Sequence, residues 1–248
     1  MATPQSGIGG TYLFDDFRSG VTALVASSDA PPLATGNGTY TLVGQGLADS
    51  DSGAEMTKGG ITLTATNEAE HAIGLTTQVC FDVGLMGTIV AETRFQQALL
   101  TTRQVFFGFS NVQTDLAILE GAIIKGDTVT LTLTASDICG FLMASELTDA
   151  ADWHAVYNGG TATGETVSTN VDLDEDAVAS TYQILRIEMD TNGTARWFID
   201  GKLKKTLAGA VSTTTDLCCS LIFEEKVTGN AAGQVDYLMV KADRDWTV

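Results

Sequence analysis

Three acidic side chains near the C-terminal end of the chain have types and spacing that could support glycoside cleavage. Glu188 and Asp190 alternate along one segment, and Asp200 follows them. Alternate residues of a β-strand lie on the same face, so Glu188 and Asp190 would share a surface. Enzymes that cleave glycosides with retention place two carboxyl groups about 5–5.5 Å apart, one as nucleophile and one as acid. Two glutamates and an assisting aspartate on one strand would supply that pair.

The second glutamate that this chemistry needs is missing. The next residue on the same face is Asn192, and its Asn-Gly pair predicts a tight hairpin turn. Glu224 and Glu225 are adjacent and would point to opposite faces. Glu92 has no acidic partner on its own strand. The pattern therefore argues against a retaining catalytic pair.

The hairpin acids are predicted to be structural instead. Glu188 and Asp190 are expected to pair with Arg186 or Arg196 across the hairpin. Asp200 precedes a glycine and is expected to occupy a second tight turn, because Asp tolerates that backbone conformation.

Other reactive patterns are not recognisable. The two histidines, His71 and His154, lie far apart in sequence, and His154 is expected to be structural. The chain shows no serine–histidine–aspartate or cysteine–histidine arrangement and no phosphate-binding glycine loop. Sugar binding remains open, because aromatic side chains beside polar groups could form such a site. The candidates are Trp153, Trp197 and Trp246.

Two acidic stretches, residues 49–53 and 172–177, could bind calcium. The second has carboxylates at alternating positions but lacks the glycine and closing glutamate of an EF-hand loop. Solvated acidic loops are the favoured interpretation of such charge runs. The sequence therefore predicts no catalytic residue, no cofactor-binding residue and no metal ligand.

The overall charge restricts the classes of partner. The 248 residues carry 31 acids against 13 Lys and Arg, a formal net charge of −18. Such a field repels phosphate backbones and anionic lipid, so we expect neither nucleic acid nor a membrane as partner. The first ten residues lack the basic and apolar regions of a signal peptide. The four cysteines (Cys80, Cys139, Cys218 and Cys219) are expected to be buried free thiols.

Short strand-like segments separated by glycine-rich turns recur along the chain and predict a sandwich or barrel. Residues 1–10 are expected to form an extended arm, and the rest a single domain. One segment, residues 114–126, has apolar residues near helical spacing and predicts a short helix. No other helix is expected. Residues 168–180 are expected to form an acidic loop or an irregular edge. The expected strands lie at 11–17, 39–44, 61–66, 87–96, 104–112, 127–146, 152–160, 182–190, 195–207, 216–227 and 234–246.

Several of these segments resemble a known superfamily. The run "LRIEMDTNGTARWFIDGKLKKTL", then "LCCSLIFEEK" and "VDYLMVKADR", is similar to the C-terminal half of concanavalin A-like lectin and glucanase domains, including laminin-G-like modules. "LFDDF" at 13–17 resembles their first strand. The resemblance implies one antiparallel jelly-roll β-sandwich over residues 11–248. It says little about function, because this fold hosts lectins, glycosidases and coat proteins.

A narrower resemblance concerns the middle of the chain. "DICGFLMASE" (137–146) and "DWHAVYNGG" (152–160), followed by the hairpin, resemble jelly-roll virion proteins of tailed bacteriophages. That resemblance implies a non-enzymatic capsid decoration protein, made in the bacterial cytoplasm and carried on the virion surface. Its partners would be the major capsid protein and further copies of itself, as a dimer or trimer. The alternative is a lectin-like carbohydrate-binding module, and a degenerate glycoside hydrolase is the third hypothesis.

Overall fold

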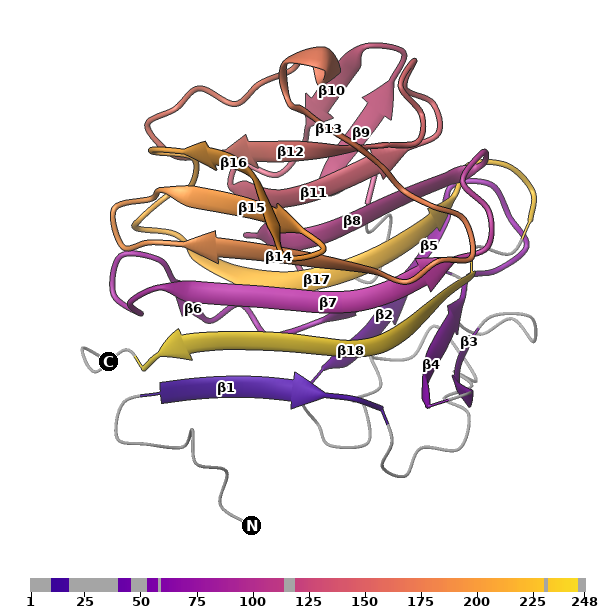
Figure 1. Ribbon diagram of the computed structural model, residues 1–248, viewed down its shortest axis with the longest axis horizontal. Coiled ribbons are helices and arrows are strands. Elements are labelled where there is room, and N and C mark those ends of the chain that lie inside the picture. The colour runs from indigo at the N-terminus through magenta and orange to yellow at the C-terminus, as the bar shows by residue number, and fades with distance from the viewer. Residues whose placement is uncertain are drawn as a thin grey trace.

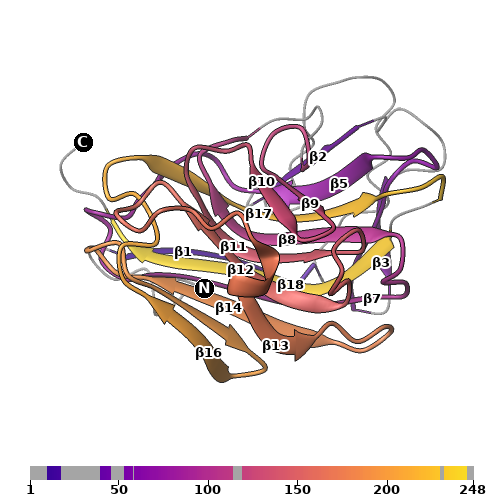
Figure 2. The ribbon, with the colours of Figure 1, turned by 90° about the horizontal axis from the view of Figure 1, so that it is seen from above.

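The protein is a sandwich of two antiparallel β-sheets. A computed structural model describes residues 10–17, 40–45, 53–57, 59–113, 119–229 and 232–244. Within them, two eight-stranded sheets pack face to face, and a separate two-stranded hairpin lies on one of them. Figures 1 and 2 show the two layers and the hairpin of β9 and β10 beside the second sheet.

The first sheet has the order β16-β15-β14-β7-β18-β4-β3, and β1 also pairs with β18. All of its pairings are antiparallel. Its strands are β1 (Gly10–Asp15), β3 (Gly53–Thr57), β4 (Gly60–Thr64), β7 (Ile89–Gln97), β14 (Gln183–Met189), β15 (Ala195–Ile199), β16 (Lys202–Leu207) and β18 (Ala232–Asp243).

The second sheet has the order β13-β12-β11-β8-β17-β5-β2, with β6 paired to β17. Its strands are β2 (Thr41–Gly44), β5 (His71–Thr76), β6 (Phe81–Asp82), β8 (Arg103–Ser110), β11 (Ile138–Ala144), β12 (Asp152–Asn158), β13 (Asp172–Asp176) and β17 (Asp216–Glu225). The separate hairpin is β9 (Ile124–Asp127) with β10 (Thr130–Leu133), and one short 3₁₀ helix, η1 (Ser168–Asn170), precedes β13.

The sequence pattern of each strand follows from what covers its faces. β7 and β14 alternate buried and half-exposed residues, because one face meets the core and the other meets water. β8 and β11 are buried at every residue. The inner face of the second sheet meets the sandwich core, and its outer face packs under β9, β10 and the turn before them. That second hydrophobic cluster includes Phe106, Leu131 and Ile222.

The predicted jelly-roll sandwich is confirmed, with differences in detail. In the segment expected to be helical, residues 114–118 lie outside the described residues, and 119–123 form turns that lead into β9. The correction has a physical reason: Leu119, Ile123 and Ile124 are buried because they cover the outer face of the second sheet. Part of the acidic segment forms the edge strand β13. Nine residues of the expected arm lie outside the described ranges, and Gly10 begins β1.

Five strands were not expected from the sequence: β3, β5, β6, β13 and β9, three of whose four residues lie in the segment expected to be helical. No helix among the described residues has the length and apolar character needed to cross a bilayer.

Candidate functional site

The acids of the C-terminal hairpin form ion pairs on the outer face of the first sheet. Arg186 Nη2 contacts Glu188 Oε1, and Arg196 Nη2 contacts Asp190 Oδ2. Arg196 Nη1 also lies 3.7 Å from Glu188 Oε2. The arginine hydrogen bond lowers the pKa of Asp190 below its ordinary value. The predicted pairing is confirmed: both carboxylates have arginine partners, and they do not form a catalytic pair with each other.

Two further hairpin and strand acids have structural partners. Asp200 adopts a positive φ of 49°, and its Oδ1 accepts a hydrogen bond of 2.8 Å from the Ile184 amide. The prediction of a turn residue is confirmed. Glu92 accepts a 2.7 Å hydrogen bond from the Tyr237 hydroxyl, and Arg186 Nη1 lies 4.0 Å from its Oε2. A bulge in β18 after Val235 turns Tyr237 toward this outer face.

The tryptophans predicted as sugar-stacking candidates are not available for that role. Trp153 and Trp197 are fully buried in the sandwich core. Trp197 Nε1 donates to the Gly140 carbonyl over 2.8 Å, so its polar end is also satisfied inside the protein. The sandwich core takes these two large aromatic side chains, so neither can serve as the exposed platform of a sugar site. Trp246 lies outside the described residues.

The remaining predicted residues have mixed outcomes. His154 is fully buried, and its Nδ1 lies 3.3 Å from the Leu142 carbonyl, as expected of a structural histidine. The four cysteines are free, and three are buried. Cys80 is exposed, contrary to the expectation, because it lies in the turn before the short strand β6.

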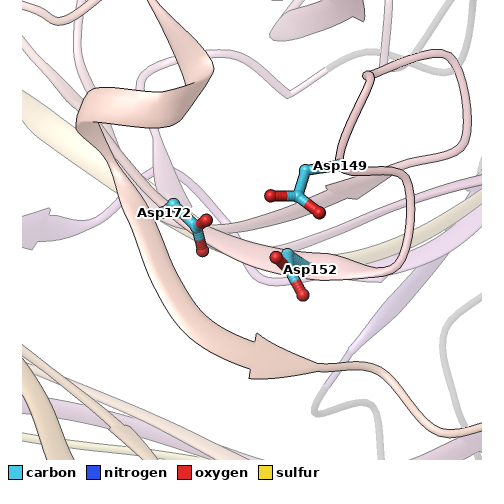
Figure 3. Close-up of side chains that lie close together, drawn as sticks. All are labelled: Asp149, Asp152 and Asp172. Atoms are coloured by element: carbon cyan, nitrogen blue, oxygen red, sulfur yellow. The ribbon is translucent and has the colours of Figure 1, made fainter.

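Three aspartates gather where the second sheet ends at β13. Figure 3 shows Asp149, Asp152 and Asp172 facing one another, and their carboxylate oxygens all lie within 4.8 Å of one another. Burial, together with hydrogen bonds to Asp176 and Asp149, raises the pKa of Asp152 to about 8. Asp152 is therefore mostly protonated at neutral pH. Of the two acidic stretches considered for calcium, the one starting at Asp172 contributes to this cluster. Most of residues 49–53 lies outside the described ranges.

A polar pocket lies on the outer face of the second sheet, away from the aspartate cluster. It has a volume of about 390 Å³, within the range of about 300–1,000 Å³ usual for ligand pockets. Four segments contribute to it: the residue after β2, the start of β5, the turn that leads into β9, and the end of β17. We call it the acidic pocket; its lining is Gln45, Ala69, Glu70, His71, Glu120, Gly121, Lys125 and Glu224.

Glu224 is the most perturbed residue of the acidic pocket. It lies on the outer face of β17, between Ala72 of β5 and Gln104 of β8, and retains only 1% exposure. Its Oε2 accepts a 3.3 Å hydrogen bond from the Glu120 amide. Burial and the nearby charge of Glu120 raise its pKa to about 8. Glu224 is therefore a buried carboxylic acid that is mostly neutral at pH 7.

A buried lysine connects the acids around the pocket. The Nζ atom of Lys226 contacts Glu120 Oε1 and lies 3.2 Å from Glu146 Oε2 and 3.7 Å from Glu224 Oε1. Lys125 Nζ lies 3.3 Å from the other oxygen of Glu120. Two ammonium groups therefore hold Glu120. Of the three acids that Lys226 contacts, Glu224 lies farthest from its nitrogen.

The two ring nitrogens of His71 have partners at the rim of the pocket. Nδ1 lies 2.6 Å from the Thr66 hydroxyl, and Nε2 lies 3.1 Å from Glu68 Oε2. The arrangement resembles a hydroxyl–histidine–carboxylate relay, but Thr66 is only 1% exposed. A hydroxyl buried in that way has no access to a substrate, so these contacts orient His71.

Sequence reasoning missed the acidic pocket. Glu224 was considered only as a partner for Glu225, and Glu120 lay in the expected helix. One signal was present: the run Glu224-Glu225-Lys226 ends a strand that is otherwise apolar or small. Charges inside a buried strand need partners, so such a run indicates a polar cluster.

The chain is therefore a jelly-roll β-sandwich with a cluster of aspartates and a polar pocket on one of its sheets. No protein-family model matches the chain, and no curated protein matches it in sequence. Solved structures of concanavalin A-like lectins and glucanases share its fold.

Three solved structures that share the fold illustrate the identities and TM-scores. The carbohydrate recognition domain of Emp47p has 13% identity and a TM-score of 0.55, covering 90% of this chain and 93% of that one. A structure from work on endo-acting O-glycanases of human gut bacteria that initiate mucin breakdown has 10% identity and a TM-score of 0.57, covering 92% and 98%. A protein of unknown function from Shewanella oneidensis MR-1 has 12% identity and a TM-score of 0.56, covering 97% and 90%. At these identities the likeness concerns the fold alone.

Proposed function

We propose that the chain is a lectin-like carbohydrate-binding module and that the acidic pocket is its sugar site. The observation that carries the proposal is the lining of this hollow. Carboxylate, amide and ammonium groups from four separate segments converge there on a space large enough for one or two sugar rings. Sugar hydroxyls both donate and accept hydrogen bonds, so a mixed polar lining suits them. The recognition domain and the O-glycanases that share the fold act on carbohydrates, which supports the same ligand class.

Binding without hydrolysis is part of the proposal. A glycosidase needs one carboxylic acid and one free carboxylate, and the raised pKa of Glu224 would suit the acid. Glu120 would have to be the free carboxylate. Lys125 and Lys226 contact its two oxygens, so it is held as an ion-pair partner rather than presented as a base or nucleophile.

The test is binding of a panel of immobilised glycans by the purified protein, with and without a bulky residue in the hollow. Ala69 lines the pocket and is exposed, so Ala69→Trp should fill the space without unfolding the protein. Ala98, which lines a separate hollow of about 190 Å³, offers the matched control Ala98→Trp. We expect Ala69→Trp to weaken binding at least tenfold and Ala98→Trp to leave it unchanged.

Two results would contradict this proposal. Binding that survives Ala69→Trp but fails in Ala98→Trp would place the sugar elsewhere. Release of reducing ends from a bound glycan, lost in Glu224→Gln, would make the protein a hydrolase. Capsid decoration, with the major capsid protein and further copies of the chain as partners, stays a prediction from sequence resemblance. Co-sedimentation with purified phage heads, without binding to any glycan, would favour it.

A further inference from the structure

Two buried oxygens of the acidic pocket accept no hydrogen bond from the described part of the chain. They are Glu224 Oε1 and Gln45 Oε1. Lys226 Nζ lies 3.7 Å from Glu224 Oε1, which is an ion-pair distance but too long for a hydrogen bond. Both residues line the same hollow. Buried polar atoms are nearly always paired in native proteins, so two such oxygens in one pocket indicate a missing partner. Gln45 Oε1 is an acceptor at any pH, and Glu224 Oε1 becomes one when the carboxyl group loses its proton.

The charges around the pocket favour a cationic donor. Three carboxyl groups line it, those of Glu70, Glu120 and Glu224, against the single ammonium of Lys125. The second nearby ammonium, Lys226, is already shared among three glutamates. The net charge of −18 adds to the same field. A positively charged ligand is therefore attracted, and a sulfated or carboxylated sugar is repelled.

The form of the cation follows from the number of acceptors. A primary ammonium group carries three N–H donors on a compact charge, whereas a sugar hydroxyl offers one. One ammonium therefore carries enough donors for the oxygens of Glu224 and Gln45, with one to spare. Calcium fits less well, because it takes about six to eight oxygen ligands. Both oxygens of Glu120 are already held by Lys125 and Lys226, so few carboxylate oxygens remain for such a shell.

We infer that the sugar bound in the acidic pocket is an amino sugar with a free, unacetylated amine, held as its ammonium ion by Glu224 and Gln45. This inference rests on the proposed carbohydrate-binding function and narrows the ligand class. An N-acetyl group would remove both the charge and two of the three donors. The single N–H that remains could serve only one of the two oxygens.

Binding of an ammonium ion should be coupled to loss of a proton. Glu120 and Glu70 disfavour the ionised form of Glu224, while Lys226 favours it. Lys125 lies beyond Glu120, and both ring nitrogens of His71 are occupied. A bound cation adds to the effect of Lys226 and shifts Glu224 toward the carboxylate. A sugar that arrives as its ammonium ion should therefore release a proton on binding near pH 7, whereas one that arrives as the free amine takes up the proton of Glu224. Calorimetry in buffers of different ionisation enthalpy measures the net release.

The experiment compares three tetrasaccharides that share the β-1,4 linkage: one of glucosamine, one of N-acetylglucosamine and one of glucose. Calorimetric titration at pH 7 in about 150 mM salt limits unspecific attraction to the acidic surface. We expect the glucosamine tetramer to bind at least tenfold more tightly than the other two. Glu224→Gln should abolish this preference and the proton release. The matched variant Glu188→Gln, on the other sheet, should keep both.

The possible failures are distinguishable. Equal binding of all three tetramers overturns the amino-sugar inference and leaves the carbohydrate-binding proposal standing. Failure of every glycan in the panel and of all three tetramers overturns both. A preference for glucosamine that Glu188→Gln weakens as much as Glu224→Gln shows a general charge effect, and the inference is wrong. Calcium chloride that binds alone and displaces the glucosamine tetramer would identify a metal site instead.

Discussion

The outer faces of the two sheets carry similar residues in different surroundings. On the first sheet, Glu188 keeps 16% of its side chain exposed and is paired with Arg186 and Arg196. On the second sheet, Glu224 keeps 1% of its side chain exposed, and the lysine nitrogen near it lies 3.7 Å away. The burial of Glu224 raises its pKa to about 8. The two glutamates therefore differ in their access to water and in the closeness of their cationic partners.

The cover of β9, β10 and the preceding turn produces this difference. Its apolar side chains remove water from the outer face of the second sheet, where they pack on Phe106 and Ile222. On the first sheet nothing comparable covers the described residues of β7 and β14, and their outward side chains alternate as half-exposed. A cover that excludes water strengthens every charge interaction beneath its edge.

Removal of Lys226 should have the largest effect. Its side chain is 3% exposed and contacts Glu120, Glu146 and Glu224. Lys226→Met removes the cation that these acids share and leaves only Lys125 beside Glu120, which should lower the free energy of unfolding by about 3–5 kcal/mol. Urea denaturation at pH 7 measures the change. A loss below about 1 kcal/mol would mean that the cluster behaves like a surface network.

A cavity under the cover should cost nearly as much. Leu131 of β10 is 1% exposed and belongs to the second hydrophobic cluster. Leu131→Ala should lower the free energy of unfolding by about 2–5 kcal/mol. Leu203 of β16 is 54% exposed, so Leu203→Ala serves as the control and should change it by less than about 0.5 kcal/mol. Equal losses would show that the cover is not packed as described.

The dependence of stability on pH should separate the two faces. The pKa of Glu224 is about 8 in the folded state, above its ordinary value of 4.5, and that of Asp152 is about 8 against 3.8. The folded protein therefore binds more protons than the unfolded chain between these values. Their extra stability is fully present below the unfolded pKa values and is lost as the pH rises toward and through about 8.

Each such group adds a slope of at most about 1.4 kcal/mol per pH unit. Urea denaturation from pH 5 to 9 should show stability falling with pH, and Glu224→Gln should make the fall shallower. Glu188→Gln should leave the curve unchanged. An equal or steeper fall in Glu224→Gln would mean that Glu224 is ionised in the folded protein at neutral pH.

The smallest effect should come from the exposed network. Arg196 keeps 31% of its side chain exposed while it pairs with Asp190 and Glu188. Arg196→Met should change the free energy of unfolding by about 0–1 kcal/mol, and less at high salt. Thermal unfolding at low and high ionic strength measures it. A loss comparable to that of Lys226→Met would remove the distinction between the faces.

The sequence alone was sufficient for the fold class and the C-terminal hairpins, because their signals are local. The Asn-Gly and Asp-Gly turns and the alternation of β14 do not depend on the rest of the chain. The acidic pocket depends on pairing between distant segments: Glu224 meets Glu120, 104 residues earlier in the chain. The burial of Trp153 and Trp197 likewise depends on which strand face meets the opposite sheet. Neither relation leaves a periodic trace in the sequence.

The last two strands also set the order in which the chain can fold. β17 lies between β8 and β5, and β18 lies between β7 and β4, so both sheets are completed at their centres by the C-terminal segment. While the ribosome is still making this segment, β7 and β8 each lack a neighbour, and their edges can pair with other chains. Pairing of β17 and β18 with their neighbours in the same chain is slow, because long loops must close first. Productive folding therefore waits until β17 and β18 have been made, and truncation before β17 would leave two sheets open at the middle.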